Sequence, residues 1–481
     1  MEELKRNKMG HEPVGKLMFK MSLPMMISML VLALYNIVDS VFISMLPDGE
    51  AGLTALSLAF PFQMLITGVA VGTGIGTCSL ASRRLGEGKK LEADRAASHG
   101  LFLSIISGIM FGIIGFFVLG DLAAGFTNNT TIQQYAKDYL TVVSAFCIFS
   151  MIQTMCEKIM QSIGKTTSSM FIQLTGAVVN IVMDPILIFG LLGFPAMGVM
   201  GAAIATVAGQ FVGMILGIIL LIKEKGINVK VFGKVKDAFG SKLPAFKFDG
   251  KIAVNIYRVG LPAIVMQSIS SVTTLALNAI LSSFNGVSPG VGDTAVAVLG
   301  VYFKLQSFVF MPVFGLNSGT MPIIAFNFGA RNKIRVRKAL KLGIISAMII
   351  MLCGLVIFQL IPDILLKLFN AEDNLMSIGT QALRTISICF PFAAFSIMCG
   401  SLFQGTGKGM YSMITTIFRQ IVTILPAAYL LATLTGDVMS VWFAYPIAEV
   451  VSTAVCAFLL IKTLKKLINP LPDMQMENLS I

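Results

Sequence analysis

The chain has 481 residues, of which 56% are hydrophobic and 12% charged. Soluble proteins carry about 25% charged residues, so this sequence has about half the usual share. A run of about 18 or more apolar residues can cross a hydrocarbon core of about 30 Å, and several charge-free stretches are longer than that. These numbers exclude a soluble enzyme with one buried core and indicate a polytopic membrane protein.

Apolar runs bounded by charged and turn-forming residues predict an all-α protein with twelve transmembrane helices. Twelve is about the number that this length allows when each crossing takes about 20–25 residues. The predicted spans are, in chain order, residues 22–46, 51–81, 97–119, 135–161, 166–192, 198–222, 256–284, 294–325, 340–361, 376–403, 410–434 and 438–461.

Lysine and arginine residues lie before the first span and after the even-numbered spans. They outnumber Asp and Glu by 36 to 24, a net charge of +12 that nucleic-acid-binding proteins also show. Cytoplasmic loops of membrane proteins are enriched in Lys and Arg, which explains this placement better. We therefore expect a multi-pass protein of the plasma (inner) membrane, with both termini cytoplasmic and no nucleic-acid partner. The main basic clusters are residues 5–20, 83–95, 223–251, 331–338 and 462–466.

No sequence pattern indicates a resident metal, an organic cofactor or ATP. The seven cysteines lie in apolar stretches without a Cys-x-x-Cys pair, and neither His11 nor His99 lies deep in a span. The glycines of the run VGTGIGT (71–77) fall inside the second span, where small residues serve close helix packing. The run Gly164-Lys165-Thr166 ends like a phosphate-binding loop, but Ile159 stands where the loop requires glycine. We expect no enzyme activity, and transport driven by an ion gradient or by substrate alone.

An internal repeat relates the two halves of the chain. Gln63 and Gln306 are 243 residues apart, and the run QSIGKTTSSM (161–170) aligns with QGTGKGMYSM (404–413) at the same offset. Each half has six spans, so both enter the membrane from the same side, as in secondary transporters with a cleft between two lobes. The expected organisation is a six-helix lobe (1–222), a charged cytoplasmic linker (223–255) and a second six-helix lobe with a short tail (256–481), pseudo-symmetric around a central cleft. Other matched pairs are Gly72 with Gly315, Gly76 with Gly319, Gly86 with Gly329 and Cys156 with Cys399.

Two acidic residues lie deep in the first half, Asp39 in span one and Asp184 in span five. Charges in hydrocarbon are costly and therefore candidates for function, and at 1.5 Å per residue the two carboxyl groups have similar depths. Asn180 lies one turn before Asp184, and Thr206 in span six reaches a similar level. This all-oxygen set suits a hard cation, whereas two close carboxyl groups can instead share a proton. The structural alternative is that both acids only bond neighbouring helices.

The second half has different deep charges, namely Lys304, Arg419 and Glu449. At the offset of 243, Asp184 becomes Ala427, so the acidic cluster is not duplicated. Lys304 or Arg419 paired with Glu449 would form a buried structural ion pair, and the alternative is a substrate or gating role.

With these residues in view, the chain resembles the multidrug and toxic compound extrusion (MATE) transporters, most closely the DinF-like and MepA-like branch. The resemblance covers nearly the full length. It rests on Leu23-Pro24 with Asp39, RLGEGKK (84–90), QSIGKT (161–166), NIVMDP (180–185) and GAAIAT (201–206).

The resemblance implies export of organic, often cationic, drugs in exchange for Na⁺ or H⁺, by lobes that rock about a central cavity. By position, the coupling cation would bind Asp39, Asn180, Asp184 and Thr206. We expect small organic molecules and the lipid bilayer as partners, and a monomer. An alternative within the same superfamily is a flippase or exporter of lipid-linked or amphipathic metabolites. Candidate residues of the substrate cleft are Met29, Tyr35, Asn36, Gln63, Met151, Gln153, Met155, Met266, Lys304 and Gln306.

Overall fold

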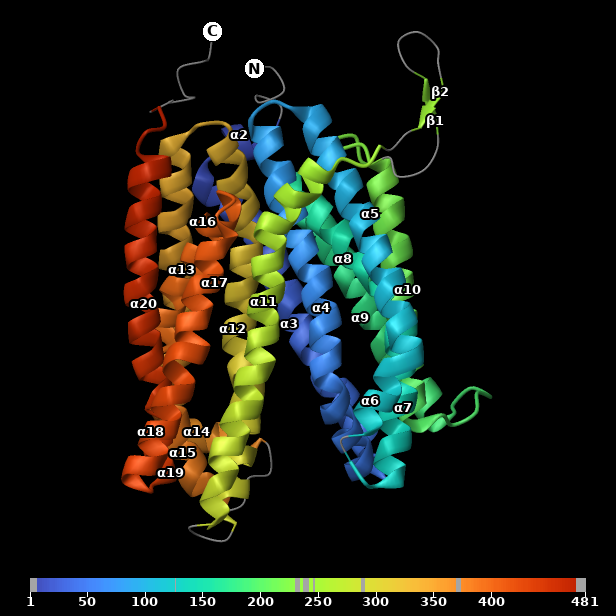
Figure 1. Ribbon diagram of the computed structural model, residues 1–481, viewed down its shortest axis with the longest axis vertical. Helices are drawn as coiled ribbons and strands as arrows, with labels where there is room; N and C mark the ends of the chain where they lie inside the picture. The colour runs from blue at the N-terminus through green and yellow to red at the C-terminus, as the bar shows by residue number, and fades with distance from the viewer. Residues whose placement is uncertain are drawn as a thin grey trace.

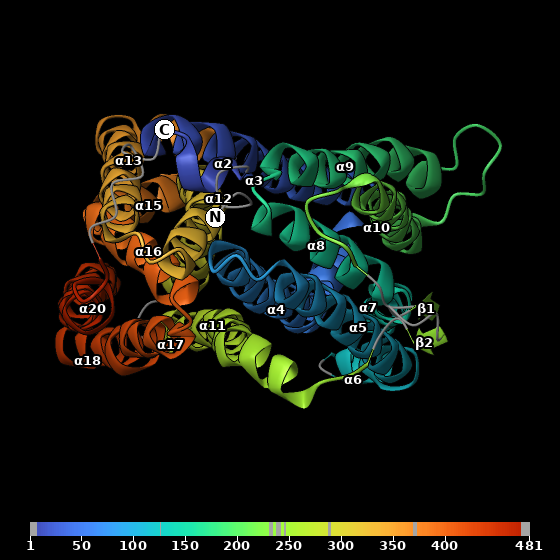
Figure 2. The same cartoon turned by 90° about the horizontal axis from the view of Figure 1, so that it is seen from above.

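The computed structural model describes residues 7–125, 127–229, 234–236, 242–244, 247–286, 290–368 and 373–472. Its helices form two bundles, which Figure 1 shows from the side and Figure 2 from above. The first bundle begins after a short helix, α2 (Lys8–His11). It consists of α3 (Val14–Ser44), α4 (Gly49–Gly86), α5 (Lys90–Ile114) with the π-helical turn η1 (Gly115–Leu119), α6 (Gly120–Ala124), α7 (Thr130–Ala145), α8 (Cys147–Ser162), α9 (Thr166–Phe189) and α10 (Gly198–Lys223).

The second bundle repeats this order. It consists of α11 (Gly250–Ser282) with the 3₁₀ turn η2 (Ser283–Gly286), α12 (Val291–Gly329), α13 (Lys333–Leu360), α14 (Pro362–Lys367), α15 (Asp373–Ser387), α16 (Phe390–Gly405), α17 (Gly409–Ile417), the π-helical turn η3 (Phe418–Ile424), α18 (Leu425–Thr435), α19 (Val438–Val441), α20 (Ala444–Thr463) and the π-helical turn η4 (Leu464–Ile468).

The expectation of twelve membrane-spanning helices agrees with this architecture. Within the described ranges, 10 helices are long and apolar enough to cross a membrane, and two helix pairs bent by 49° raise the number to 12 if each pair is one span. Several helices begin earlier than predicted: α3 begins at Val14, not 22, and α13 begins at Lys333, not 340. The predicted spans covered only the apolar part of each helix, whereas a helix continues into the interfacial region with charged residues such as Lys16 and Lys20.

The connection between the bundles differs from the predicted linker, residues 223–255. It is shorter, because α11 already begins at Gly250. It also contains a short antiparallel strand pair that an all-α expectation did not include, β1 (Lys234–Lys236) with β2 (Lys242–Pro244). Residues 230–233, 237–241 and 245–246 of the predicted linker lie outside the described part of the chain.

Helix boundaries in the two bundles follow the same 243-residue offset as the sequence repeat. The bent pair α7–α8 runs from Thr130 to Ser162, and its counterpart α15–α16 from Asp373 to Gly405. The bends also correspond, since the first follows Ala145 and the second follows Ser387. In the second pair, Pro391 lies in the first turn of α16, a position that proline favours and that begins a new helix.

The two bundles meet through glycines that the repeat had paired. α4 packs on α11, and α12 packs on α3. A Cβ atom on Gly72 would lie 2.8 Å from the carbonyl oxygen of Gly260, and one on Gly315 would lie 2.6 Å from that of Met25. In both contacts, the absence of a side chain lets two helix backbones approach each other closely. The glycines inside span two therefore serve helix packing, as the sequence indicated.

These contacts lie in the halves of the helices nearest the termini. Near the end of α4, Ser79 Oγ donates a hydrogen bond of 2.5 Å to the carbonyl oxygen of Gln404. A Cβ atom on Gly86 would clash with the carbonyl oxygen of Phe326, and one on Gly329 with that of Arg83. At the opposite end the bundles diverge (Figure 1). The molecule is thus joined on the side that carries both termini.

Replacing Gly315 with alanine tests this interface. All three atoms nearest the new Cβ are backbone atoms of Met25 and Met26, which cannot move aside independently. Overpacking of this kind costs about 1–3 kcal/mol, so we expect Gly315→Ala to lower the midpoint of thermal unfolding in detergent. The matched control is Gly300→Ala in the same helix, where no atom lies within 4 Å of the new Cβ. Equal midpoints for the two variants would contradict the proposed role of Gly315.

Candidate functional site

The four residues expected to bind the coupling cation come together inside the first bundle. Asp39 on α3 and Asp184 on α9 each lie five residues before the end of their helix, at Ser44 and Phe189. All four side chains are buried, including Asn180 on α9 and Thr206 on α10. Asn180 Nδ2 lies 3.4 Å from both Asp184 Oδ1 and Thr206 Oγ1, long distances for hydrogen bonds.

Close packing of α9 on α10 makes this assembly possible. A Cβ atom on Gly209 would lie 2.5 Å from the carbonyl oxygen of Gly176 and 3.2 Å from the Cβ of Asn180. Gly209, about one turn after Thr206, therefore lets α10 pack directly against the part of α9 that precedes Asp184. Pro185 follows within α9 and has no N–H, so the carbonyl oxygen of Ile181 lacks its usual helical donor.

The two carboxyl groups are neighbours that interact with each other, and Asp39 also interacts with Asn180. Ionised carboxylates only accept hydrogen bonds, so a bond between them requires that one carries a proton. Three buried oxygens in the cluster have no hydrogen-bond partner: Asp39 Oδ1, Asn180 Oδ1 and Asp184 Oδ2. Unpaired buried acceptors are costly, and either a proton or a cation would satisfy them. The residues present thus fit either coupling ion.

Two tyrosines extend the cluster. Tyr35 lies one turn before Asp39 on α3 and is within electrostatic range of both carboxyl groups. Tyr139 on α7 is within electrostatic range of Asp39 and accepts a hydrogen bond of 3.0 Å from Gln63 Nε2. Tyr35 and Gln63 were among the cleft candidates, but Tyr139 was not. The depth of Tyr139 in its span is a signal that could have indicated it, although a neutral hydroxyl group is less conspicuous in an apolar helix than an acid.

The other cleft candidates are dispersed. Met151 and Met155 are fully buried in the apolar core of the first bundle, so the expectation that they line the cleft does not hold in this conformation. Gln153 points between α9 and α10 and donates a hydrogen bond of 3.2 Å to Glu157. Sequence could not separate a core methionine from a cleft methionine, because both are apolar positions on an apolar helix. Met29, Met266 and Gln306 are half-buried, whereas Asn36 and Lys304 are exposed.

In the second bundle, Arg419 is the partner of Glu449. Arg419 Nη1 lies 3.1 Å from Glu449 Oε1, with side-chain exposures of 25% and 7%. The pair joins η3 to α20, and the second carboxylate oxygen of Glu449 is buried without a hydrogen-bond partner. Of the two arrangements that the sequence left open, the structure therefore has the one with Arg419. Lys304 lies exposed on α12.

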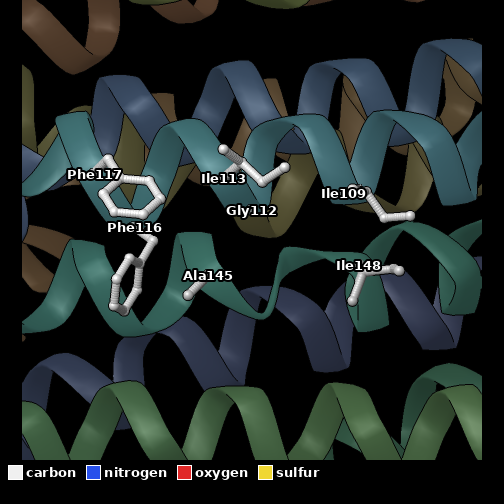
Figure 3. A pocket seen from close by; sticks show the side chains of 8 residues that line it. Ile109, Gly112, Ile113, Phe116, Phe117, Ala145 and Ile148 are labelled. Carbon is white, nitrogen blue, oxygen red and sulfur yellow. The ribbon is translucent and has the colours of Figure 1, made fainter.

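An apolar groove on the first bundle is distinct from this cluster. It has a volume of about 350 Å³ and lies between the α5–η1 helix and the α7–α8 pair. Figure 3 shows Ile109, Ile113, Phe116, Phe117 and Ile148 around it. Its lining includes no charged side chain, so it has none of the chemistry that a cation site requires.

Comparison with known proteins agrees with this fold. The MatE family model matches residues 24–186 and 262–430, one segment in each bundle. The chain belongs to the MATE family of transporters. A curated relative, "Multidrug export protein MepA" of Staphylococcus haemolyticus, is 27% identical over 446 residues, 93% of this chain and 92% of that protein. The protein of the same name from Staphylococcus aureus is 26% identical over 434 residues, 89% of this chain and 90% of that protein.

Solved MATE structures have the same fold. An "outward-facing conformation of a multidrug resistance MATE family transporter of the MOP superfamily" is 27% identical with a TM-score of 0.86, covering 97% of this chain and 98% of that one. A MOP superfamily transporter from Pyrococcus furiosus, characterised by a "reverse polarity of binding pocket", is 28% identical with a TM-score of 0.86. That match covers 95% of this chain and 98% of the other. A MATE transporter is not an enzyme, so the expectation of no catalytic activity is confirmed.

The Arg419–Glu449 pair makes a testable prediction. Removing one partner of a buried ion pair leaves a charge uncompensated and costs about 3–5 kcal/mol, whereas replacing both by apolar residues can be neutral. We expect Arg419→Leu to lower the thermal midpoint in detergent strongly, and Arg419→Leu/Glu449→Leu to recover most of it. A double variant less stable than either single variant would show that the pair does not act as a unit.

Proposed function

We propose that this MATE transporter exports small organic, often cationic, compounds across the plasma membrane in exchange for Na⁺ or H⁺. The observation that carries the proposal is the buried Asp39–Asp184 cluster, with three oxygens that lack partners inside one bundle. The relatives named as multidrug export proteins support the substrate class.

The geometry of the cluster supports exchange between an ion and a drug. Two neighbouring carboxyl groups bind a proton or a cation tightly, because their charges would otherwise repel each other in a buried site. Binding or release of that ion changes the charge of the first bundle. A change of charge alters the relative stability of two packing arrangements, and this is how an ion gradient can drive a conformational cycle.

The arrangement of the bundles supports alternating access. They touch in the half that carries the termini and diverge at the other end (Figure 1). Between α4 and α11, Gln267 Nε2 lies 4.0 Å from Met64 Sδ. Asp39 and Asp184 lie toward the diverging end. With both termini cytoplasmic, as the basic clusters indicate, this is an outward-facing state. Met29, Tyr35, Gln63, Met266 and Gln306 remain candidates for contact with the substrate.

The two acids are expected to be essential for transport. Asparagine keeps the size of the side chain but cannot be ionised, so Asp39→Asn and Asp184→Asn should each abolish efflux of a cationic dye from cells. The control is Asp121→Asn, because Asp121 is exposed and pairs with exposed Lys137, at 2.6 Å. The amount of each variant in the membrane fraction is measured, so that a loss of efflux is not mistaken for a loss of protein. Normal efflux by both cluster variants would refute the proposed site.

The coupling ion can be determined with purified protein in liposomes. Dye transport is measured first under an imposed Na⁺ gradient at equal pH, and then under a pH gradient without Na⁺. We expect one gradient to drive uptake, and expect the Asp184→Asn variant to lose that response. Equal transport with and without either gradient would contradict ion-coupled exchange.

A further inference from the structure

The short helix α2, which precedes the first bundle, is held by the second bundle. Arg335 Nη2 donates hydrogen bonds to the carbonyl oxygens of Met9 at 3.1 Å and Glu12 at 2.7 Å. Asn327 Nδ2 donates to the same Met9 oxygen at 3.0 Å, and Arg335 Nε donates to Asn327 Oδ1 at 3.0 Å. The carbonyl groups at the end of α2 are thus bonded to α12 and α13.

Packing around Met9 shows that α2 touches both bundles. Met9 is fully buried and belongs to the apolar core of the second bundle, with Phe326 and Val336. Met9 also contacts the first bundle. A Cβ atom placed on Gly164, in the turn between α8 and α9, would lie 3.4 Å from the Cγ atom of Met9. Burial also lowers the pKa of the neighbouring Lys8 ammonium group, as expected for a segment held against protein. α2 therefore bridges the two bundles.

The segment before the second bundle has a corresponding attachment. His99 on α5 accepts a hydrogen bond of 2.8 Å at Nε2 from the backbone N–H of Asp249. His99 Nδ1 lies 2.7 Å from the carbonyl oxygen of Arg95, so it carries the proton in this neutral tautomer. The ring of Phe248 lies 5.8 Å from that of His99. Asp249 also caps α11 through a hydrogen bond from Lys251 N. The start of α11 is thus fastened to the first bundle.

These two attachments cross between the bundles in the same way. Each segment is covalently continuous with the first long helix of one bundle, α3 or α11. Each is hydrogen-bonded to the third span of the other bundle, where Arg335 lies on α13 and His99 on α5. Neither contact includes the Asp39–Asp184 cluster or the Arg419–Glu449 pair. If the bundles separated at this end, both sets of hydrogen bonds would have to break.

We propose that α2 and the Phe248–Asp249 segment are crossed tethers that hold the end of the molecule carrying the termini closed, with Arg335 and His99 as their positioning residues. This inference rests on the alternating access proposed above. The tethers stabilise the state in which the glycine interface is formed and must detach when that interface opens. They therefore set the ratio of the two conformations without touching ion or substrate.

The distance between the bundles at this end tests the proposal. Spin labels are attached at Leu91→Cys on α5 and Lys338→Cys on α13, both exposed, after exposed Cys353 is replaced by serine. Distance distributions are then recorded by pulsed EPR without drug or gradient. We expect Arg335→Ala and His99→Phe each to raise the ratio of long to short distances about tenfold, which corresponds to about 1.4 kcal/mol. Phenylalanine keeps the ring beside Phe248 but cannot accept the hydrogen bond.

The matched control is Arg337→Ala, since Arg337 lies on the same helix but bonds Asn469 of its own bundle at 2.6 Å. Arg335→Lys, which keeps a charged donor, should lie between wild type and Arg335→Ala. The proposal would be overturned if the distance distributions of Arg335→Ala and His99→Phe were the same as that of Arg337→Ala, whether all three stay at the wild-type distribution or all three shift equally.

Two further measurements separate this result from other failures. Size-exclusion profiles and thermal midpoints show whether each variant is folded, and the milder His99→Phe variant tests one tether if Arg335→Ala does not fold. The same distances are recorded in the Asp39→Asn background. If Arg335→Ala and His99→Phe change the distances in the Asp39→Asn background too, the tether proposal holds even when ion coupling through Asp39 is refuted. If they change the distances in neither background, the tether proposal is refuted and the proposed ion coupling is unaffected.

Discussion

Close backbone contact between α4 and α11, and between α12 and α3, is the constraint on which the architecture depends. In lipid there is no hydrophobic driving force for apolar helices to associate, so the bundles are held together by tight packing at glycines. Because Gly72 and Gly315 occupy equivalent places in the repeat, the two contacts are copies of each other. Both lie toward the termini, which leaves the opposite ends free to diverge. The shape of the transporter thus follows from where the glycines are placed along two helices.

Within this symmetric scaffold, the buried charges are asymmetric. In the described part of the first bundle, no Lys or Arg acts on Asp39 or Asp184, and unpaired oxygens lie on Asp39, Asn180 and Asp184. The second bundle holds Glu449 with Arg419 as its counter-charge. An uncompensated site gains stability from a bound cation or proton, whereas a paired site does not need one. The helix framework is therefore duplicated in both bundles, whereas the uncompensated acidic cluster is found in the first bundle and not at the equivalent place in the second.

Much of this could be predicted from sequence, because hydrocarbon imposes simple rules. A membrane helix must be long and apolar, so the ten long helices and two bent pairs in the described ranges agree with the expected spans. A charge at depth is rare, so Asp39 and Asp184 could be selected and matched by counting residues along their helices. Rotation about the helix axis is harder to predict. Met151 and Met155 point into the core, and no periodic polar face distinguished them from methionines that face a cleft.

The positions of the helices, the repeat and the depth of the two acids were thus determined by the sequence itself, since each depends only on hydropathy and on distance along the chain. Tertiary structure alone decided which residues face one another. It placed Tyr139 beside Gln63, paired Arg419 rather than Lys304 with Glu449, and attached α2 to Arg335 across more than 300 residues of chain. Such contacts depend on how each helix is rotated and packed, and no pattern along a single helix records that.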